Sequence, residues 1–303
     1  MNPLARPNCS NNTFKEISYT DHKVYDGQRA DPKVIKEAFV EHGYIVAGNV
    51  STAADRDSAV SLLQRQVKHH PGASINGFFE LYHDDALAQL RQNPTMVKLF
   101  ETLWDNKKLW VVFDRCIYMR PETDHNSFLP LHVDQNPHTQ PGFSAVQGLL
   151  ALRDCDKTTG MLGIIPGSHH DFGQYKSWSD DKQGWIEYQG EDVQDRWQTL
   201  RAVQLKEGEM VVWDSRLTHS RFNPDPDCTD DRRERMLAMI SFLPASADEA
   251  LREKRVHALE SGEGQYNHEA GLRKTAGSHF ESLRVNRENL TATGRKIYGV
   301  EPW

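Results

Sequence analysis

The chain has 303 residues, of which 26% are charged and 38% are hydrophobic, and its formal net charge at pH 7 is -7. A chain of this length and composition can bury one sizeable core and is globular rather than disordered. The acidic balance argues against a nucleic acid or an anionic membrane surface as the main partner, because both require a basic face. We therefore expect a globular protein that binds neither, organised as one domain over residues 1–303.

Cysteine spacing and hydropathy indicate the compartment. Cys9, Cys116, Cys155 and Cys228 are far apart and form no CxxC pair, which fits a reducing interior and argues against cysteine-bound zinc. No apolar run reaches the roughly 18 residues of a membrane-spanning helix, and the N-terminus has no apolar segment of a secretory signal. We therefore expect a cytoplasmic protein. The sequence contains no pattern that indicates its oligomeric state.

Helix signals dominate the first hundred residues. Asp31 followed by Pro32 is a helix start, Gly43 is a helix end, and Thr52 with Asp55 has the spacing of a capping box. Two more helical patterns follow, at 84–91 and 95–104. We expect an N-terminal helical region over 1–105, interrupted by a short strand at 44–46.

Short apolar runs separated by turn residues follow. The candidate strands are Leu109–Met119, Leu131–Val133, Ala145–Leu152, Met161–Ile165, Met210–Trp213, Thr218–Phe222 and Met236–Leu243. This pattern favours a jelly-roll sandwich or barrel over 106–245, with a polar insertion at about 171–200. Beyond it we expect a C-terminal helical extension over 246–303, which begins at a capping box of Ser246 and Glu249.

One pair of side chains has the spacing of metal ligands. His132 and Asp134 lie two residues apart in LPLHVDQNP, so on a strand both leave the same face. Two histidines and one carboxylate on one face of an octahedron leave three positions open, which is typical of Fe(II) that activates O2. The second histidine would come from a later strand, and His219 in WDSRLTHSRF is the best candidate. We predict that His132, Asp134 and His219 form this metal site.

An arginine-rich turn follows and leads into the strand MLAMISF. An arginine at the start of that strand is suited to bind a carboxylate through two hydrogen bonds. Arg235 shares a strand face with Leu237 and Met239, and Arg233 has the same parity and is the alternative.

Four segments in order resemble the phytanoyl-CoA dioxygenase family of Fe(II)- and 2-oxoglutarate-dependent oxygenases. These are LPLHVD, GMLGIIPGSHH, GEMVVWDSRLTHS and RMLAMISF, and the resemblance covers about 111–244. It implies a mainly β fold with flanking helices, whose core is a double-stranded β-helix (jelly-roll or cupin-like). It also implies that His132, Asp134 and His219 bind Fe(II) and that Arg235 pairs with the C5 carboxylate of 2-oxoglutarate. The family arginine usually follows the distal histidine more closely than Arg235 does, so Arg233 stays the alternative. Positions of secondary co-substrate contacts fall on Tyr118 and Ser168.

The implied activity is oxidation, most often hydroxylation, of a small organic substrate, with 2-oxoglutarate and O2 converted to succinate and CO2. Asp134 argues against halogenation, because related halogenases have a small residue at that position. Desaturation, epoxidation and ring formation start from the same chemistry, so the triad does not choose among them. Two alternatives are an oxygenase that acts on a macromolecule and a non-catalytic metal- or ligand-binding β-barrel; the complete triad disfavours the second.

Several other side chains have two interpretations. Trp213 either packs in the core or forms a wall of the pocket. His169 and His170 follow Pro-Gly-Ser, and we expect them to hold a loop rather than to bind metal. Arginine is unfavourable when buried without a partner, so arginines beside the predicted strands either face the pocket and bind an anionic part of the substrate or pair with carboxylates. These are Arg115, Arg120, Arg153 and Arg216.

Overall fold

Two main sheets form the centre of the molecule in the computed structural model, which describes residues 17–70, 74–75, 77–121, 129–180, 184–228, 231, 233–264 and 283–303. The larger sheet contains, in spatial order, β1 (Val24–Asp26), β2 (Tyr44–Gly48), β12 (Met210–Asp214), β8 (Val146–Ala151), β14 (Arg235–Met239), β6 (Cys116–Met119), β4 (Phe78–Phe79) and β3 (Ser74–Ile75). The smaller sheet contains β10 (Ile186–Glu187), β7 (His132–Val133), β13 (His219–Phe222), β9 (Met161–Ile164) and β11 (Arg201–Val203). A separate ribbon pairs β5 (Leu109–Val111) with β15 (Phe242–Pro244).

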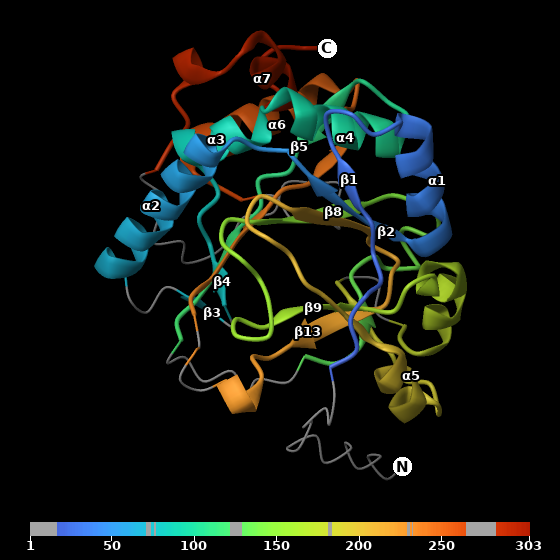
Figure 1. Cartoon of the computed structure of the whole chain (residues 1–303). Coiled ribbons are helices and arrows are strands. Elements are labelled where there is room, and N and C mark those ends of the chain that lie inside the picture. The colour runs from blue at the N-terminus through green and yellow to red at the C-terminus, as the bar shows by residue number, and fades with distance from the viewer. Residues whose placement is uncertain are drawn as a thin grey trace.

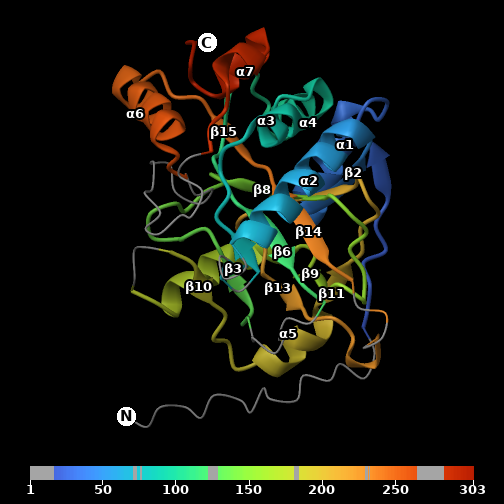
Figure 2. The same cartoon turned by 90° about the vertical axis from the view of Figure 1, so that its left-hand side faces the viewer.

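Helices cover one side of this arrangement. They are α1 (Pro32–His42), α2 (Ala53–His69), α3 (Asp85–Arg91), α4 (Pro94–Trp104), α6 (Glu249–Ser261) and α7 (Ala292–Ile297). Figures 1 and 2 show these helices on one side of the larger sheet and strands β9 and β13 on the other. The far side carries α5 (Val193–Thr199), and the 3-10 helix η2 (Ser168–Ser177) lies in the same insertion region. Two shorter 3-10 turns are η3 (Pro226–Cys228) and η4 (Arg287–Asn289).

Strand β14 shows how the larger sheet separates two apolar clusters. Met236 and Ala238 belong to the cluster shared with the helices, whereas Leu237 and Met239 belong to the cluster on the side of the smaller sheet. Successive side chains of a strand point to opposite faces, so this alternation follows from the backbone. Every residue with the parity of Leu237, including Arg235, therefore faces the smaller sheet.

The predicted start and end signals of the N-terminal helices are confirmed. The Asp31 carboxylate accepts the amide of Lys33 at the start of α1, and the Thr52 hydroxyl accepts the amide of Asp55 at the start of α2. Gly43 ends α1 in the left-handed region at φ 76°. Helix termini need such partners because the amides of their first turn have no acceptor within the helix.

The capping box at Ser246 is wrong. Asp248 is the N-cap of α6, and its carboxylate accepts the amides of Ala250 and Leu251. Ser246 instead accepts the amide of Asp248 through its hydroxyl. The aspartate directly precedes the helix and is as good a capping residue as serine, so it takes the position.

Two of the predicted strands are each divided into two shorter strands, and the breaks lie opposite each other. The run 109–119 divides into β5 and β6, and the run 236–243 divides into β14 and β15. The pieces pair with one another, β5 with β15 and β6 with β14, and the amide of Val112 donates to the carbonyl of Ser241 between them. The N-terminal region is also less purely helical than expected, because β1–β4 join the larger sheet. Among the described helices, none is both long and apolar enough to cross a bilayer.

Gly43 supplies a test of how the fold positions the strand that carries His219. A Cβ at Gly43 would lie 2.5 Å from Nδ1 of His169 and 2.7 Å from Cδ1 of Leu217, in a backbone conformation that side chains disfavour. We expect Gly43→Ala to lower the free energy of unfolding by about 2–4 kcal/mol, measured by thermal or urea unfolding. Gly142→Ala is the matched control, since a Cβ there meets nothing within 4 Å. Equal stability of the two variants would contradict this account.

Candidate metal centre and its cavity

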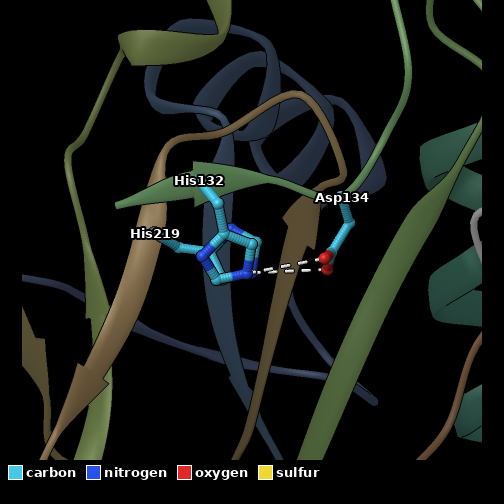
Figure 3. A group of neighbouring side chains, drawn as sticks. All are labelled: His132, Asp134 and His219. Carbon is cyan, nitrogen blue, oxygen red and sulfur yellow. Dashed lines mark ion pairs between the residues drawn. The ribbon is translucent and has the colours of Figure 1, made fainter. Parts of the chain in front are cut away.

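His132, Asp134 and His219 come together at adjacent strands of the smaller sheet. His132 is paired with His219 across β7 and β13, and Asp134 directly follows β7. One ligand atom from each of the three side chains lies within 4.8 Å of the others. Figure 3 shows both imidazole rings beside the carboxylate of Asp134. Three donors in this arrangement can hold one divalent cation.

Backbone hydrogen bonds orient both imidazole rings. Nδ1 of His132 donates to the carbonyl of Pro130 at 2.8 Å, and Nδ1 of His219 donates to the carbonyl of Leu217 at 2.9 Å. A carbonyl can only accept, so the proton sits on Nδ1 and the coordinating atom is Nε2. The Nε2 atoms lie 3.5 Å (His132) and 3.3 Å (His219) from the Asp134 carboxylate.

The charges of the three groups favour a cation. Burial works to raise the pKa of Asp134, but His219 and His132 outweigh it and hold that pKa well below its usual range. Burial likewise works to lower the pKa of His219, but the Asp134 carboxylate outweighs it and raises that pKa. Burial and the neighbouring His219 lower the pKa of His132. The Asp134 carboxylate is therefore held ionised beside both imidazole rings, which favours a divalent cation at this point.

Strands of the larger sheet complete the surroundings of the triad. Gln147 of β8 is only 3% exposed, and its Nε2 donates to Oδ2 of Asp134 at 2.7 Å. Trp213 of β12 is paired with Gln147, and its ring centroid lies 5.8 Å from that of His219. Trp213 is thus a wall of the site as well as a core residue. Trp185, 46% exposed, sets its ring against His132 with centroids 5.0 Å apart, so the insertion contributes to the site.

A cavity of about 500 Å³ extends from the triad between the sheets. Its apolar walls include Leu149, Leu162 and Met239, and it also contains charged side chains. The described charged groups that line it, besides the triad, are Asp114, Arg115, Arg221 and Arg235. The site is therefore an apolar pocket with a few fixed charges, as binding sites for small molecules commonly are.

Arg235 is the buried cation of this cavity. It starts β14 opposite Met119 of β6, is 4% exposed, and approaches the Met119 sulfur at 4.0 Å through Nη1. Its Nε is buried without a hydrogen-bond partner, and no carboxylate of the described residues forms an ion pair with it. A buried guanidinium without a counter-charge is unfavourable, so this position calls for an anionic ligand.

Three predicted contact residues lie outside the cavity. Tyr118 has the parity that faces the helices, packs in the cluster shared with them, and donates its hydroxyl to Glu234. Ser168 accepts the amide of Thr218, so it supports the segment just before His219 instead of facing the pocket. Arg233 precedes β14, its side chain is 50% exposed, and it pairs with Asp156. Strand β14 begins at Arg235, so the alternation of side chains that put Arg233 on the same face does not apply to it.

The arginines beside the core strands divide in the structure. Arg115 lines the cavity, where its Nε lies 3.4 Å from Asp114 and its guanidinium lies 4.4 Å from the ring centre of Phe78. Arg153 pairs with carboxylates on the outside, and Arg216 pairs with Asp214. Arg120 is not among the residues that line this cavity.

Sequence reasoning missed several polar residues of the site, among them Arg221 and Gln147. Arg221 lies two residues after His219, so the spacing that joined His132 to Asp134 would also have found it. Gln147 gives no such signal, because it lies within the apolar run of β8 and its partner Asp134 follows β7 in the other sheet. His169 and His170 behave as expected, since both hydrogen-bond to backbone carbonyls near the end of α1.

The sequence of the chain matches that of a known protein family. Residues 22–222 match the sequence profile of the family described as Phytanoyl-CoA dioxygenase (PhyH). A putative phytanoyl-CoA dioxygenase of Dictyostelium discoideum is 23% identical, over 71% of this chain and 76% of that protein. The Ava biosynthesis cluster protein O of Aspergillus versicolor is 24% identical over 47% of this chain. The chain spans only half the length of that second relative.

Solved structures share the fold at low identity. GlcNAc Inducible Gene 2 of Candida albicans has a TM-score of 0.71 at 13% identity, over 93% of this chain and 80% of that one. The epimerase SnoN, solved with Fe3+, alpha ketoglutarate and a nogalamycin compound, has a TM-score of 0.54 at 17% identity, over 71% of this chain and 85% of that one. At these identities the likeness concerns the fold alone.

The triad makes a direct prediction about metal binding. We expect His132→Ala, Asp134→Ala and His219→Ala each to abolish Fe(II) binding, because two remaining ligands hold a divalent ion poorly. Metal content after anaerobic loading and gel filtration measures this. His170→Ala, an exposed histidine outside the triad, should keep normal stoichiometry. Near-normal iron in folded His132→Ala and Asp134→Ala would refute the assignment.

Gln147 makes a second prediction, as a residue that positions a ligand. Gln147→Met keeps the size of the side chain but removes the hydrogen bond to Asp134. We expect the affinity for Fe(II) to fall roughly 10- to 100-fold, the range found when such outer partners are lost. Titration against a competing chelator measures the change. An unchanged dissociation constant would show that Asp134 is oriented without Gln147.

Proposed function

Because the chain belongs to the phytanoyl-CoA dioxygenase family, we propose that it is an Fe(II)- and 2-oxoglutarate-dependent oxygenase that oxidises a small organic substrate. The observation that carries this proposal is the convergence of His132, Asp134 and His219, with Nε2 of both rings directed at one point by backbone hydrogen bonds. We assign the facing sheets to a double-stranded β-helix, with the metal between them.

The donor set fits Fe(II). Two imidazoles and one carboxylate are the ligands of oxygen-activating non-haem iron, and they leave positions for a co-substrate and O2. When bound, the iron would supply oxidative decarboxylation of 2-oxoglutarate to succinate and CO2, coupled to oxidation of the substrate. The protein's own part is to hold the three donors, and Gln147 fixes the carboxylate among them.

Arg235 is the proposed anchor for the co-substrate. It reaches the cavity from the larger sheet, whereas the two histidines belong to the smaller one. A dicarboxylate bound at the metal through one end can place its other carboxylate on this guanidinium. That carboxylate then supplies the missing counter-charge. Arginine suits the task because its parallel N–H groups match the two carboxylate oxygens.

The rest of the cavity would bind the substrate and exclude water. Its volume suits a small molecule, and Leu149, Leu162 and Met239 give it apolar walls against which a substrate can pack. Dry surroundings favour controlled oxidation because they suppress side reactions. We propose hydroxylation as the outcome, since it requires no second reactive group from the protein. A protein of similar fold is an epimerase, so a substrate screen should also look for products other than hydroxylated ones.

The first test is an anaerobic titration of the metal-free protein with Fe(II) and then 2-oxoglutarate. We expect a weak visible charge-transfer band from the chelate, and its loss in His219→Ala. If the folded wild type binds Fe(II) but forms no band with 2-oxoglutarate, the proposed function fails and a metal-binding module without oxygenase activity takes its place.

Arg235 supplies a second test. We expect Arg235→Ala to raise the 2-oxoglutarate concentration needed for half of the band at least tenfold, because a charge-assisted pair contributes about 1.5–3 kcal/mol, while Fe(II) stays bound. Arg233→Leu is the control, since Arg233 is exposed and pairs with Asp156. A larger effect of Arg233→Leu than of Arg235→Ala would reverse the assignment.

A further inference from the structure

Asp114 and Arg115 lie in the break that divides the run 109–119 into β5 and β6. Phe113 packs in the cluster shared with the helices, and so does Cys116, three residues later. Members of one strand face are separated by even numbers of residues, so the alternation shifts by one residue inside this break. As a result Asp114 and Arg115, although consecutive, both line the cavity.

The backbone and one carboxylate oxygen of Asp114 are held in place. The residue is only 1% exposed, and Nη2 of Arg91 donates to its carbonyl at 2.8 Å. Oδ1 accepts the amide of Arg115 at 2.8 Å and lies 3.4 Å from Nε of the same residue. No described residue donates a hydrogen bond to the other carboxylate oxygen, Oδ2. A buried acceptor of this kind is unfavourable until a donor reaches it, and the cavity is where a donor can arrive.

Strand register places Asp114 at the metal end of the cavity. The amide of Met239 donates to the carbonyl of Arg115, the neighbour of Asp114. Met239 is paired with Leu149 of β8, which lies two residues from Gln147. Gln147 is the residue that bonds the carboxylate of the triad. Asp114 and the metal ligands are therefore close to the same end of the larger sheet.

Arg235 lies at the opposite end of the same strands. It is paired with Met119, four residues after Arg115. An extended chain rises about 3.3 Å per residue, so these two positions are roughly 13 Å apart along the chain. A co-substrate that extends from the metal to Arg235 therefore runs away from Asp114 and leaves it to the primary substrate.

We propose that Asp114 is a specificity-determining residue for the primary substrate, and that it selects a molecule with a hydrogen-bond donor, a hydroxyl or a protonated amine, near the carbon that is oxidised. The inference rests on the proposed function, because it assigns a role beside the same metal. Oδ2 accepts the donor and so holds the substrate at a fixed place relative to the triad. A hydrogen bond to an ionised acceptor in an apolar cavity is stronger than one between neutral groups, so the preference for a donor is large.

Four ring compounds of nearly equal size test this preference. Cyclohexanol and cyclohexylamine, which is protonated at neutral pH, carry a donor, whereas cyclohexanone carries only an acceptor and cyclohexanecarboxylate carries an anion. Calorimetric titration of the protein loaded with Fe(II) and 2-oxoglutarate, without O2, gives their dissociation constants. We expect at least one of the two donors to bind roughly 10- to 100-fold more tightly than cyclohexanone, and the carboxylate to bind most weakly. The donor that binds more tightly identifies the group that the substrate carries.

Asp114→Asn should reverse the preference while keeping the size of the side chain. Its amide oxygen can still accept the amide of Arg115, and its NH2 group then takes the place of Oδ2. We expect this variant to bind cyclohexanone more tightly than cyclohexanol, because the cavity now offers a donor. Asp114→Ala, which offers neither group, should bind the two equally and keeps the test decisive if the asparagine variant does not fold.

Asp154→Asn is the matched control. Asp154 also accepts a backbone amide, that of Glu207, and pairs with Lys206, but it is not among the described residues that line the cavity. This variant should keep the wild-type order of affinities. Equal affinity of the wild type for all three neutral and cationic probes, tightest binding of the carboxylate, or a preference for donors that survives in Asp114→Asn and Asp114→Ala would each overturn the proposal.

The titration with Fe(II) and 2-oxoglutarate separates this inference from the proposed function. If no chelate band forms, yet the metal-free protein prefers a donor and loses the preference in Asp114→Asn, the role of Asp114 stands and the oxygenase assignment fails. If the band forms but the affinities do not depend on Asp114, the oxygenase assignment stands and the role of Asp114 fails.

Discussion

The antiparallel register between β7 and β13 is the constraint on which the site depends. It places His132 opposite His219, and Asp134 then lies beside both rings although it is outside the paired segment. A shift of one residue in this register would turn one of the histidines to the other face of the sheet. The carbonyls of Pro130 and Leu217 add a second constraint, because they fix which ring nitrogen is free to coordinate.

Side chains of the larger sheet alternate between the helices on one face and the cavity on the other. One face of β14 packs against the helices through Met236 and Ala238, and the other face directs Arg235 and Met239 into the cavity. The helices thus stabilise the sheet whose opposite face carries polar groups toward the metal. Gln147 and Trp213 are paired across β8 and β12 and line the cavity, whereas their neighbours Val146 and Val212 pack in the cluster shared with the helices.

Charge is distributed unevenly along the cavity. The triad combines one carboxylate with two imidazoles, whereas Arg221 and Arg235 contribute two positive charges from opposite sheets. A buried guanidinium without a counter-charge is unfavourable, so the protein alone holds Arg235 at an energetic disadvantage. A ligand that is anionic at both ends, bound between the metal and Arg235, would remove that disadvantage, and the proposed co-substrate is such a ligand.

Local sequence determined the features that depend on neighbours along the chain. The caps at Asp31, Thr52 and Gly43 were predictable because a cap acts within one helical turn. The pairing of His132 with Asp134 on one face was predictable because strand side chains alternate. His219 was the best candidate for the second histidine because it lies in a later extended segment, and the ordered motifs supported it, since nothing local links it to a strand more than eighty residues earlier. The structure brings all three together.

Tertiary structure decided the rest. Whether Tyr118 faces the helices or the cavity depends on which face of β6 is covered, and whether Arg233 reaches the pocket depends on where β14 begins. Gln147 and Arg221 enter the site because strands from two sheets face each other across it. The chain by itself specifies which residues share a face; only the packing of the sheets specifies which faces meet, because that is set by contacts between segments distant in sequence.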